Sequence, residues 1–448
     1  MRSKLFVWSV LGIEALMILL FGIFVRVEDS ASIETVGSSS GLDSATAQLQ
    51  LYPFFQDINV MIFVGFAFNM AFLKYHTWNS ISLNFLVGAI GVQLYIVFNG
   101  FWQAAIQNDW SNPIELSLRK LIAGEYCVAT ILISFGAVLG KVNAMQMLVM
   151  TFIESFVYAF TEVIVVQQIK VVDYGGSFVV HAFGAYFGVM VSYIASPENT
   201  KDNLNNDTSY KSMVFASIGT MFLWMFWPSA NSAFAKNPQE QHLSIINTFL
   251  ALSASTLTTF SISCLFNDGK FKMQDVMNAC LAGGVLIGSS CNFIVYPAIS
   301  ILIGAVAGMM TTFGLERSNE YMTVKYNLYD TCGVQYLHGI PGILGALISA
   351  AIIVTRDYTI YELNERKFGI DYSFSEQAGY QILGMLICVV VPAVFGTLTG
   401  YIIRKPVFFN EEDDIFVDGP YWVGAKISEH SRSYDLTKGG ASSIRSQI

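Results

Sequence analysis

The chain has 448 residues, of which 54% are apolar and 13% are charged, and its formal net charge is −9. A soluble globular domain carries about 25% charged residues, so this composition excludes an ordinary soluble protein and indicates one that lies in a membrane. The sequence has no basic stripe, and we therefore expect no nucleic-acid partner. A porin-like barrel would show short alternating segments instead of long apolar runs.

Apolar runs of about 20 residues recur along the chain, as an all-α polytopic membrane protein requires. The first run follows a basic MRSK start and exceeds the about 7–15 residues of a signal-peptide core, so we interpret it as a retained helix. Charged or turn-rich breaks divide the chain into about twelve predicted transmembrane helices. They lie at residues 5–25, 53–73, 81–101, 118–139, 144–166, 175–195, 212–235, 243–265, 275–292, 294–314, 331–353 and 377–402.

The distribution of Lys and Arg predicts the orientation of these helices. Placing the N-terminus in the cytoplasm puts most basic loop residues on the cytoplasmic side, as the positive-inside bias prefers. With about twelve spans, the C-terminus lies on the same side. We therefore expect a transmembrane domain at residues 1–404 and a cytoplasmic polar tail at residues 405–448.

Two short motifs repeat each other, DYGGSFVVH at residues 173–181 and DTCGVQYLH at residues 330–338. Each begins with Asp, has Gly three residues later and ends with His. They open the sixth and eleventh predicted helices, which cross the membrane in opposite directions. The pattern predicts two inverted five-helix repeats around a central pore, with extra N- and C-terminal helices, although short Gly-rich segments can also match by chance. The predicted repeat units are residues 52–196 and 211–354.

The two histidines, His181 and His338, are the strongest functional candidates. Eight residues of helix rise about 12 Å, so both rings are expected near the centre of an apolar layer about 30 Å thick. A histidine there needs a polar partner, and such residues mark ion or proton paths more often than plain packing. We expect the two rings to hydrogen-bond to each other. Two histidines without a third ligand make a poor metal site, so we predict no metal and no cofactor.

Three carboxylates accompany the histidines. Asp173 and Asp330 each begin a helix, where an Asp commonly caps the free backbone N–H groups. Asp330 is interpreted as the repeat-equivalent structural residue. Asp173 faces outside in the predicted topology, where it could also help to hold an arriving cation. Glu162, near the outer end of the fifth predicted helix, is assigned to the same outer vestibule.

At these positions the sequence resembles the ammonium transporter family, and within it the Rhesus glycoprotein branch. The matching motifs occur in the expected order and are specific when taken together. They are ISFGAVLGKV (133–142), DYGGSFVVHAFGAYFG (173–188), GTMFLWMFWPSANSAF (219–234), NACLAGGV (278–285) and DTCGVQYLHGIPGILG (330–345).

The resemblance implies a homotrimer in the lipid bilayer, in which each protomer has its own narrow pore. His181 and His338 match the family's paired pore histidines, and Asp173 matches the Asp near its outer recruitment site. Ammonium would be captured outside, where Tyr126 joins Asp173 and Glu162 in the outer recruitment site by offering an aromatic face, and it would be deprotonated there. Ammonia would then pass along the histidines, with CO₂ as a candidate second gas. The resemblance also implies a multi-pass protein of the plasma membrane or an internal membrane of a eukaryotic cell, and no enzymatic activity.

The sequence departs from the family at the outer gate, where two Phe rings usually stack above the histidines. Alignment on the motifs puts Tyr126 at one position and Ala230 at the other. Unless a neighbouring ring fills the space beside Ala230, the constriction would be wider than is usual. The candidates are Phe222, Phe226 and Trp227.

Two other functions are compatible with parts of this pattern. A proton-coupled secondary transporter of another small solute could use the histidines as a proton relay, although the apolar residues around His338 disfavour a roomy polar site. A transport-silent membrane scaffold is the other alternative. Silent Rhesus relatives lack the paired histidines, so their presence argues against this function.

Overall fold

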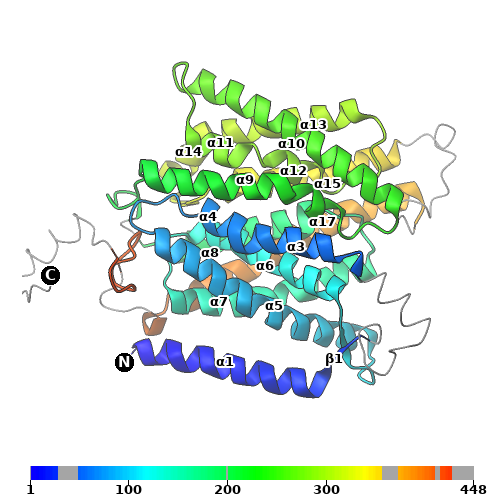
Figure 1. Ribbon diagram of the computed structural model, residues 1–448, viewed down its shortest axis with the longest axis horizontal. Helices are drawn as coiled ribbons and strands as arrows, with labels where there is room; N and C mark the ends of the chain where they lie inside the picture. The colour runs from blue at the N-terminus through cyan, green and yellow to red at the C-terminus, as the bar shows by residue number, and fades with distance from the viewer. Residues whose placement is uncertain (1, 29–48, 198–199, 356–371, 409–413, 426–448) are drawn as a thin grey trace, which may run out of the picture.

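The computed structural model describes residues 2–28, 49–197, 200–355, 372–408 and 414–425. Within these ranges the chain is a bundle of helices whose axes lie roughly along one common line, with successive helices running back and forth (Figure 1). Ten of the described helices are long and apolar enough to cross a membrane. The predicted all-α polytopic fold is therefore confirmed, whereas the predicted tail beyond residue 425 lies outside the described ranges.

The helices of the first half of the chain carry one of the two histidines. They are α1 (Arg2–Phe24), α3 (Tyr52–Val60), η3 (Met61–Phe66), α4 (Ala67–Asn69), α5 (Thr77–Gln107), α6 (Leu118–Val138), α7 (Ala144–Glu162), η4 (Val163–Gln168), η5 (Ser177–Ala182) and α8 (Phe183–Ala195). Two short strands, β1 (Val25–Val27) and β2 (Ile114–Leu116), pair in parallel and tie the end of α1 to the start of α6.

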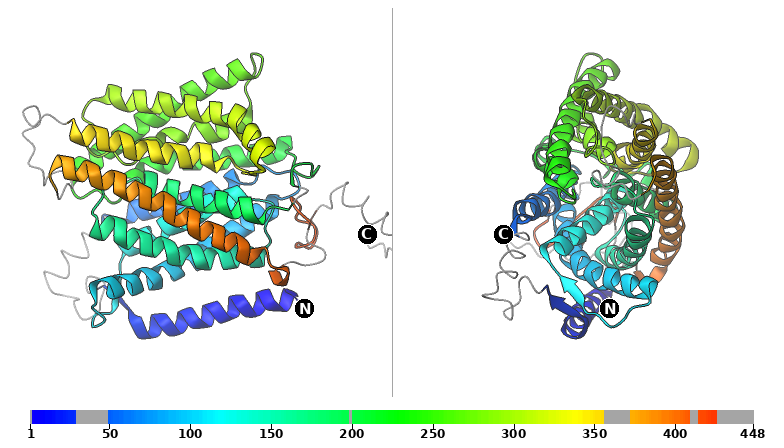
Figure 2. Two further views of the ribbon diagram at one scale, coloured as in Figure 1. Left: turned by 180° about the vertical axis from the view of Figure 1, so that it is seen from behind. Right: turned by 90° about the vertical axis from the view of Figure 1, so that its right-hand side faces the viewer.

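The helices of the second half carry the other histidine. They are α9 (Tyr210–Ser232), α10 (Pro238–Phe266), α11 (Met273–Ala279), α12 (Ala282–Ile287), α13 (Pro297–Phe313), η7 (Gly314–Ser318), α14 (Asn319–Tyr326), η8 (Gln335–Gly339), α15 (Ile340–Val354), α17 (Phe374–Ile403) and the short 3₁₀ turn η10 (Pro406–Phe408). On the far side of the bundle, α17 runs obliquely across α7, α8 and α15 (Figure 2).

The ninth predicted span differs from the expectation, because it is not one continuous helix. The chain turns between α11 and α12 and leaves helical structure again after Ile287. Close packing explains why this segment is glycine-rich. A Cβ on Gly283 would lie 2.4 Å from the Ala251 carbonyl oxygen, and a Cβ on Gly284 would lie 2.5 Å from Nε1 of Trp227.

The two Asp-to-His segments contact their neighbours in the same way. The backbone N–H of Gly175 donates to the carbonyl of Gly288, just beyond the end of α12. The backbone N–H of Cys332 donates to the carbonyl of Gly136, near the end of α6. The helices α6 and α12 hold equivalent places in the two halves of the chain. The Asp-to-His segment of each half therefore donates a hydrogen bond to the corresponding helix region of the other half. We propose on this basis that residues 52–196 and 211–354 are inverted repeat units, as the sequence pattern predicts.

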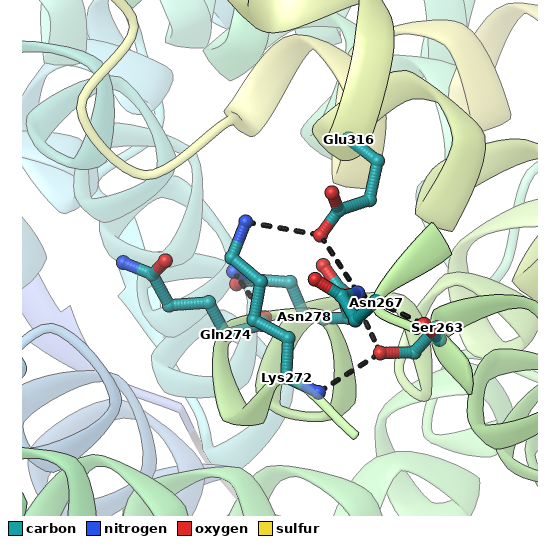
Figure 3. Close-up of polar contacts among 7 residues, drawn as sticks. Ser263, Asn267, Lys272, Gln274, Asn278 and Glu316 are labelled. Atoms are coloured by element: carbon teal, nitrogen blue, oxygen red, sulfur yellow. Dashed lines mark hydrogen bonds and ion pairs between the residues drawn. The ribbon is translucent and has the colours of Figure 1, made fainter. Parts of the chain in front are cut away.

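A polar cluster closes the turn between α10 and α11 onto η7 (Figure 3). Lys272 and Glu316 form an ion pair with 2.9 Å between Nζ and Oε1. The Ser263 hydroxyl donates to Asp275 Oδ2 at 2.6 Å and accepts the backbone N–H of Lys272 at 3.0 Å. The turn passes through Asp268 and Gly269, both at positive φ. These bonds fix the α10–α11 connection at one end of the bundle.

Residues 414–425 also pack against an end of the bundle, the one at which α1 begins (Figures 1 and 2). Phe416 is 1% exposed, and its backbone N–H donates to the Gly140 carbonyl at 2.7 Å. Both carboxylate oxygens of Asp418 accept backbone N–H groups at the start of α5, from Trp78 at 2.7 Å and Asn79 at 2.9 Å. This part of the predicted polar tail is therefore docked on the helices.

Tight helix crossings give a direct stability test at Gly219 in α9. A Cβ at this position would lie 2.0 Å from the backbone nitrogen of Asn69, whereas a Cβ on Gly12 in α1 would have no atom within 4 Å. Both glycines are helical, so Ala adds the same intrinsic propensity to each helix. We expect Gly219→Ala to destabilise the protein by about 1–3 kcal/mol through overpacking, and Gly12→Ala not to destabilise it. Thermal unfolding of both variants in detergent measures this, and equal melting temperatures would contradict the crossing.

Candidate pore and vestibule

A cavity of about 810 Å³ opens at the end of the bundle where β2 pairs with β1, the strand labelled in Figure 1. Its wall includes all three residues that the sequence assigned to the outer site, Asp173, Tyr126 and Glu162. The lining reaches Val180, the residue directly before His181 in the chain. We call this cavity the vestibule. The vestibule thus leads from one end of the bundle to the level of the first histidine.

Glu162 anchors a polar network in the wall of the vestibule. Its Oε2 accepts a hydrogen bond from the Tyr95 hydroxyl at 2.8 Å and another from Asn99 Nδ2 at 2.7 Å. Lys120 donates to the other side of the same amide, at Asn99 Oδ1. A positive and a negative side chain are therefore joined through one Asn, which keeps both charges hydrogen-bonded at the edge of the bundle.

Asp173 holds the start of the helix that carries His181. Its Oδ1 accepts the Ser177 N–H at 2.7 Å, and its Oδ2 accepts the N–H groups of Phe178 at 3.0 Å and Val179 at 2.9 Å. Gly176 makes the turn at a φ of 66°. Burial raises the pKa of Asp173 to about 6, although the backbone N–H groups act in the opposite direction. The carboxylate is therefore negative at neutral pH and takes up a proton as the pH falls through about 6.

Asp330 does the same for the helix that carries His338, at the other end of the bundle. Its Oδ1 accepts the Val334 N–H at 3.0 Å and its Oδ2 accepts the Gln335 N–H at 2.9 Å, while Gly333 turns at a φ of 70°. The Lys141 ammonium donates to Ser192 Oγ at 2.7 Å and to the carbonyl of Tyr329, directly before Asp330. Asp330 is absent from the vestibule wall, so the two Asp residues are structurally equivalent but differently exposed.

The two histidines meet inside the bundle, as the sequence predicts. Their Nδ1 atoms are 3.1 Å apart, and the rings are nearly parallel with centroids separated by 5.1 Å. His181 is 6% exposed and His338 is 5% exposed. Each ring lies in a π-helical turn, η5 or η8. The expectation that they lie within hydrogen-bond reach is confirmed, whereas their part in conduction stays a prediction.

The geometry of the pair restricts the proton positions on the two rings. A neutral imidazole has one N–H and one acceptor nitrogen. Because Nδ1 faces Nδ1, one ring must donate and the other must accept, so their tautomers differ. One Nε2 then accepts a hydrogen bond and the other Nε2 donates one. The pair can thus offer both kinds of hydrogen bond to a small polar molecule.

The outer gate is built differently from the expectation. Tyr126 donates its hydroxyl hydrogen to the carbonyl oxygen of Ala230, so the tyrosine itself spans the space beside the small residue. The ring of Phe234 meets Tyr126 edge to face, with centroids 4.9 Å apart and planes at 86°. Tyr126 and Phe234 both line the vestibule, and Ala230 does not.

Among the three rings proposed to replace the missing side chain, Trp227 is the one that stacks on His181 in the described ranges. It is 2% exposed and stacks on His181 with centroids 5.5 Å apart. Phe222 and Phe226 stack on each other at 6.2 Å, and within the described chain neither forms a ring stack with His181 or His338. Tyr126 thus reaches Ala230 and Trp227 packs on His181, whereas the part of these rings in a gate stays a prediction.

Sequence reasoning missed several residues of the vestibule wall. Phe234 was part of a quoted motif but was not assigned to the gate. Arg119 and Lys120 are charged residues at the very start of an apolar span, a position that marks a polar mouth, and this signal was available. The hydrogen bonds of Tyr95 and Asn99 to Glu162 join helices distant in sequence, which a single sequence does not reveal.

Comparison with known proteins agrees with this geometry. The sequence model of the Ammonium Transporter Family matches residues 16–414. Ammonium transporter Rh type C of Homo sapiens is 35% identical over 423 residues, covering 92% of this chain and 88% of that protein. Ammonium transporter Rh type B-B of Xenopus laevis is 36% identical over 434 residues, covering 94% of this chain and 93% of that protein.

Solved structures show the same relationship. The structure of Nitrosomonas europaea Rh50, a member of the Rhesus protein family of channels, matches with a TM-score of 0.73 at 28% identity, covering 88% of this chain and 97% of that chain. Mep2 of Saccharomyces cerevisiae shares the fold, with a TM-score of 0.68 at 17% identity and coverage of 86% and 92%. The chain belongs to the ammonium transporter family, and within it to the Rhesus branch.

Proposed function

We propose that this protein is a membrane channel that conducts ammonia. The observation that carries the proposal is the buried pair His181–His338 below a vestibule lined by Asp173 and Glu162. The relatives named as ammonium transporters and the match to Rh50 support it. The protein is a transporter and not an enzyme.

The vestibule is the site of ammonium capture. Asp173 and Glu162 supply negative charge at its wall, and Tyr126 offers an aromatic face to a small cation. An unpaired cation is costly in the apolar part of a membrane, so the cation does not continue past this level. Ammonium transfers a proton to water in the open vestibule, the proton returns to the outer solution, and neutral ammonia goes on.

The histidine pair guides the neutral molecule. Ammonia both donates and accepts hydrogen bonds, which is what two rings of opposite tautomer offer at their Nε2 atoms. Trp227 stacked on His181 keeps the surroundings of the first ring apolar. The pathway thus favours ammonia over ammonium by its low polarity, while the rings replace hydrogen bonds to water.

We further propose that both chain ends face the cytoplasm and that the protein assembles as a homotrimer in a cellular membrane. The start of α1 and residues 414–425 lie at the end of the bundle opposite the vestibule (Figure 1), which agrees with the positive-inside bias. CO₂ is a candidate second gas for the same pore. Mass measurement of the detergent-solubilised protein tests the trimer.

Replacing either histidine by Ala tests the pathway. Each ring supplies a hydrogen bond with a net value of about 1 kcal/mol or more, so we expect ammonia flux to fall by about five- to tenfold in His181→Ala and in His338→Ala. Stopped-flow pH recording on proteoliposomes under an ammonium gradient measures the flux.

His242→Ala is the matched control, since His242 is exposed on α10, and it should conduct normally. The double variant should lose less than the product of the two single losses, because each single change already breaks the pair. Normal flux in both single variants would exclude the histidines from the pathway. Proton-linked accumulation of a larger solute would favour a secondary transporter instead.

The charge on Asp173 predicts a pH dependence at the outer face. Its pKa is raised to about 6, so the carboxylate is negative above pH 6 and becomes neutral as the outer pH falls below it. Losing a unit charge near the cation weakens capture, and we expect the half-saturating ammonium concentration to rise about three- to tenfold between pH 7.5 and pH 5. Flux titrations at a series of outer pH values measure this.

Asp173→Asn should show a high half-saturating ammonium concentration at every pH. The step in this concentration near pH 6 should be absent. Asp330→Asn is the control, because Asp330 lies outside the vestibule wall, and it should keep the step. A step that survives in Asp173→Asn would mean that another group titrates, and Asp173 would then be only a helix cap.

A further inference from the structure

Arg119 occupies the aromatic wall of the vestibule. Its guanidinium carbon lies 4.9 Å from the centroid of the Phe234 ring, and Phe234 in turn packs edge to face on Tyr126. All three residues line the vestibule. The aromatic face beside Tyr126 is thus already covered by a cation that belongs to the protein.

The neighbouring Lys120 shows that this arrangement is particular to Arg119. Lys120 bonds to Asn99 and so joins the network of Glu162. Arg119 forms no ion pair with any carboxylate of the described ranges, and its polar neighbours are the hydroxyl-bearing side chains Tyr174 and Tyr126. Its positive charge is therefore left to act on the ring and on whatever enters the vestibule.

The face of one aromatic ring binds one cation at a time, because two cations on the same face repel each other. Ammonium, alkylammonium and guanidinium ions all bind such faces. A guanidinium that is tethered to the start of α6 is present at a high effective concentration. A free cation must displace it before it can bind Phe234.

We propose that Arg119 is a specificity-determining residue, which occupies the aromatic cation site at Phe234 and so keeps quaternary ammonium ions away from the mouth of the pore. The inference rests on the proposed function only in calling this wall the mouth of an ammonia pathway. Ions that cannot lose a proton are then rejected at the vestibule and do not block it. Ammonium is captured at the carboxylate side, near Asp173 and Glu162.

Tetramethylammonium is the probe for this site, because it binds aromatic faces and has no proton to lose. Its binding to the purified detergent-solubilised protein can be measured by saturation-transfer NMR, which requires no transport. We expect Arg119→Gln to bind it about five- to thirtyfold more tightly than the unaltered protein, the range given by about 1–2 kcal/mol of cation–π energy. Arg119→Lys, which retains a cation, should gain less.

Two variants separate the ring from the general charge of the cavity. Lys236→Gln removes the same charge from the same vestibule wall and should leave tetramethylammonium binding within about twofold, since charges in open water are screened. Adding Phe234→Leu to Arg119→Gln should abolish the gain. Equal gains in Arg119→Gln and Lys236→Gln, or a gain that survives Phe234→Leu, would overturn the proposal. The size-exclusion elution volume and the circular dichroism spectrum of Arg119→Lys, compared with those of the unaltered protein, check that the variant is folded.

A transport measurement then connects the site to the pore. Tetramethylammonium should inhibit ammonium-driven pH change in proteoliposomes of Arg119→Gln and not in those of the unaltered protein. Inhibition of both alike would contradict the role of Arg119. Absence of ammonia flux in the unaltered protein would instead refute the proposed function, while the binding series would still decide whether Arg119 covers the ring.

Discussion

The backbone N–H groups at the start of two buried helices are the constraint on which the pore depends. A helix leaves its first N–H groups without partners, and a buried group without a partner is destabilising by several kcal/mol in an apolar surrounding. Asp173 and Asp330 each accept these groups with both oxygens. They fix where each helix starts, and therefore where a ring eight residues further on must lie.

The two ends of the pathway differ although the helix starts are alike. At one end the vestibule is wide and charged. At the other end Lys141 is bonded to Ser192 and to the Tyr329 carbonyl, and burial lowers the pKa of Lys141 to about 7, although Asp330 acts against this shift. Phe416 packs beside it on Gly140. The proposed inverted repeat thus supplies matching helix starts at the two ends of the pathway. The loops around these helix starts make one end of the pathway different from the other.

The sequence was sufficient to predict the helical bundle, the opposed motifs and the contact between His181 and His338, because the two motifs have equal spacing and cross the bundle in opposite directions. The expected rise over eight helical residues was wrong, since helical structure begins only four residues after each Asp, at Ser177 and at Val334. It did not predict which ring covers His181. Trp227 and Phe226 are adjacent on α9, and only their rotation against η5 decides between them. Arg119 lies at the start of α6 and Phe234 lies just beyond the end of α9. Their contact therefore depends on how α6 and α9 pack.

The π-helical turns at His181 and His338 make these segments sensitive to the insertion or deletion of a residue. A π-turn contains one residue more than an α-turn of the same height, and each residue of an α-helix turns the side-chain direction by about 100°. Removing one residue from Phe178–Val180 would let η5 close into a regular α-helix and would swing the following imidazole away from its partner. The rings are thus kept in register by a local excess of one residue, so this stretch tolerates substitution more readily than a change of length.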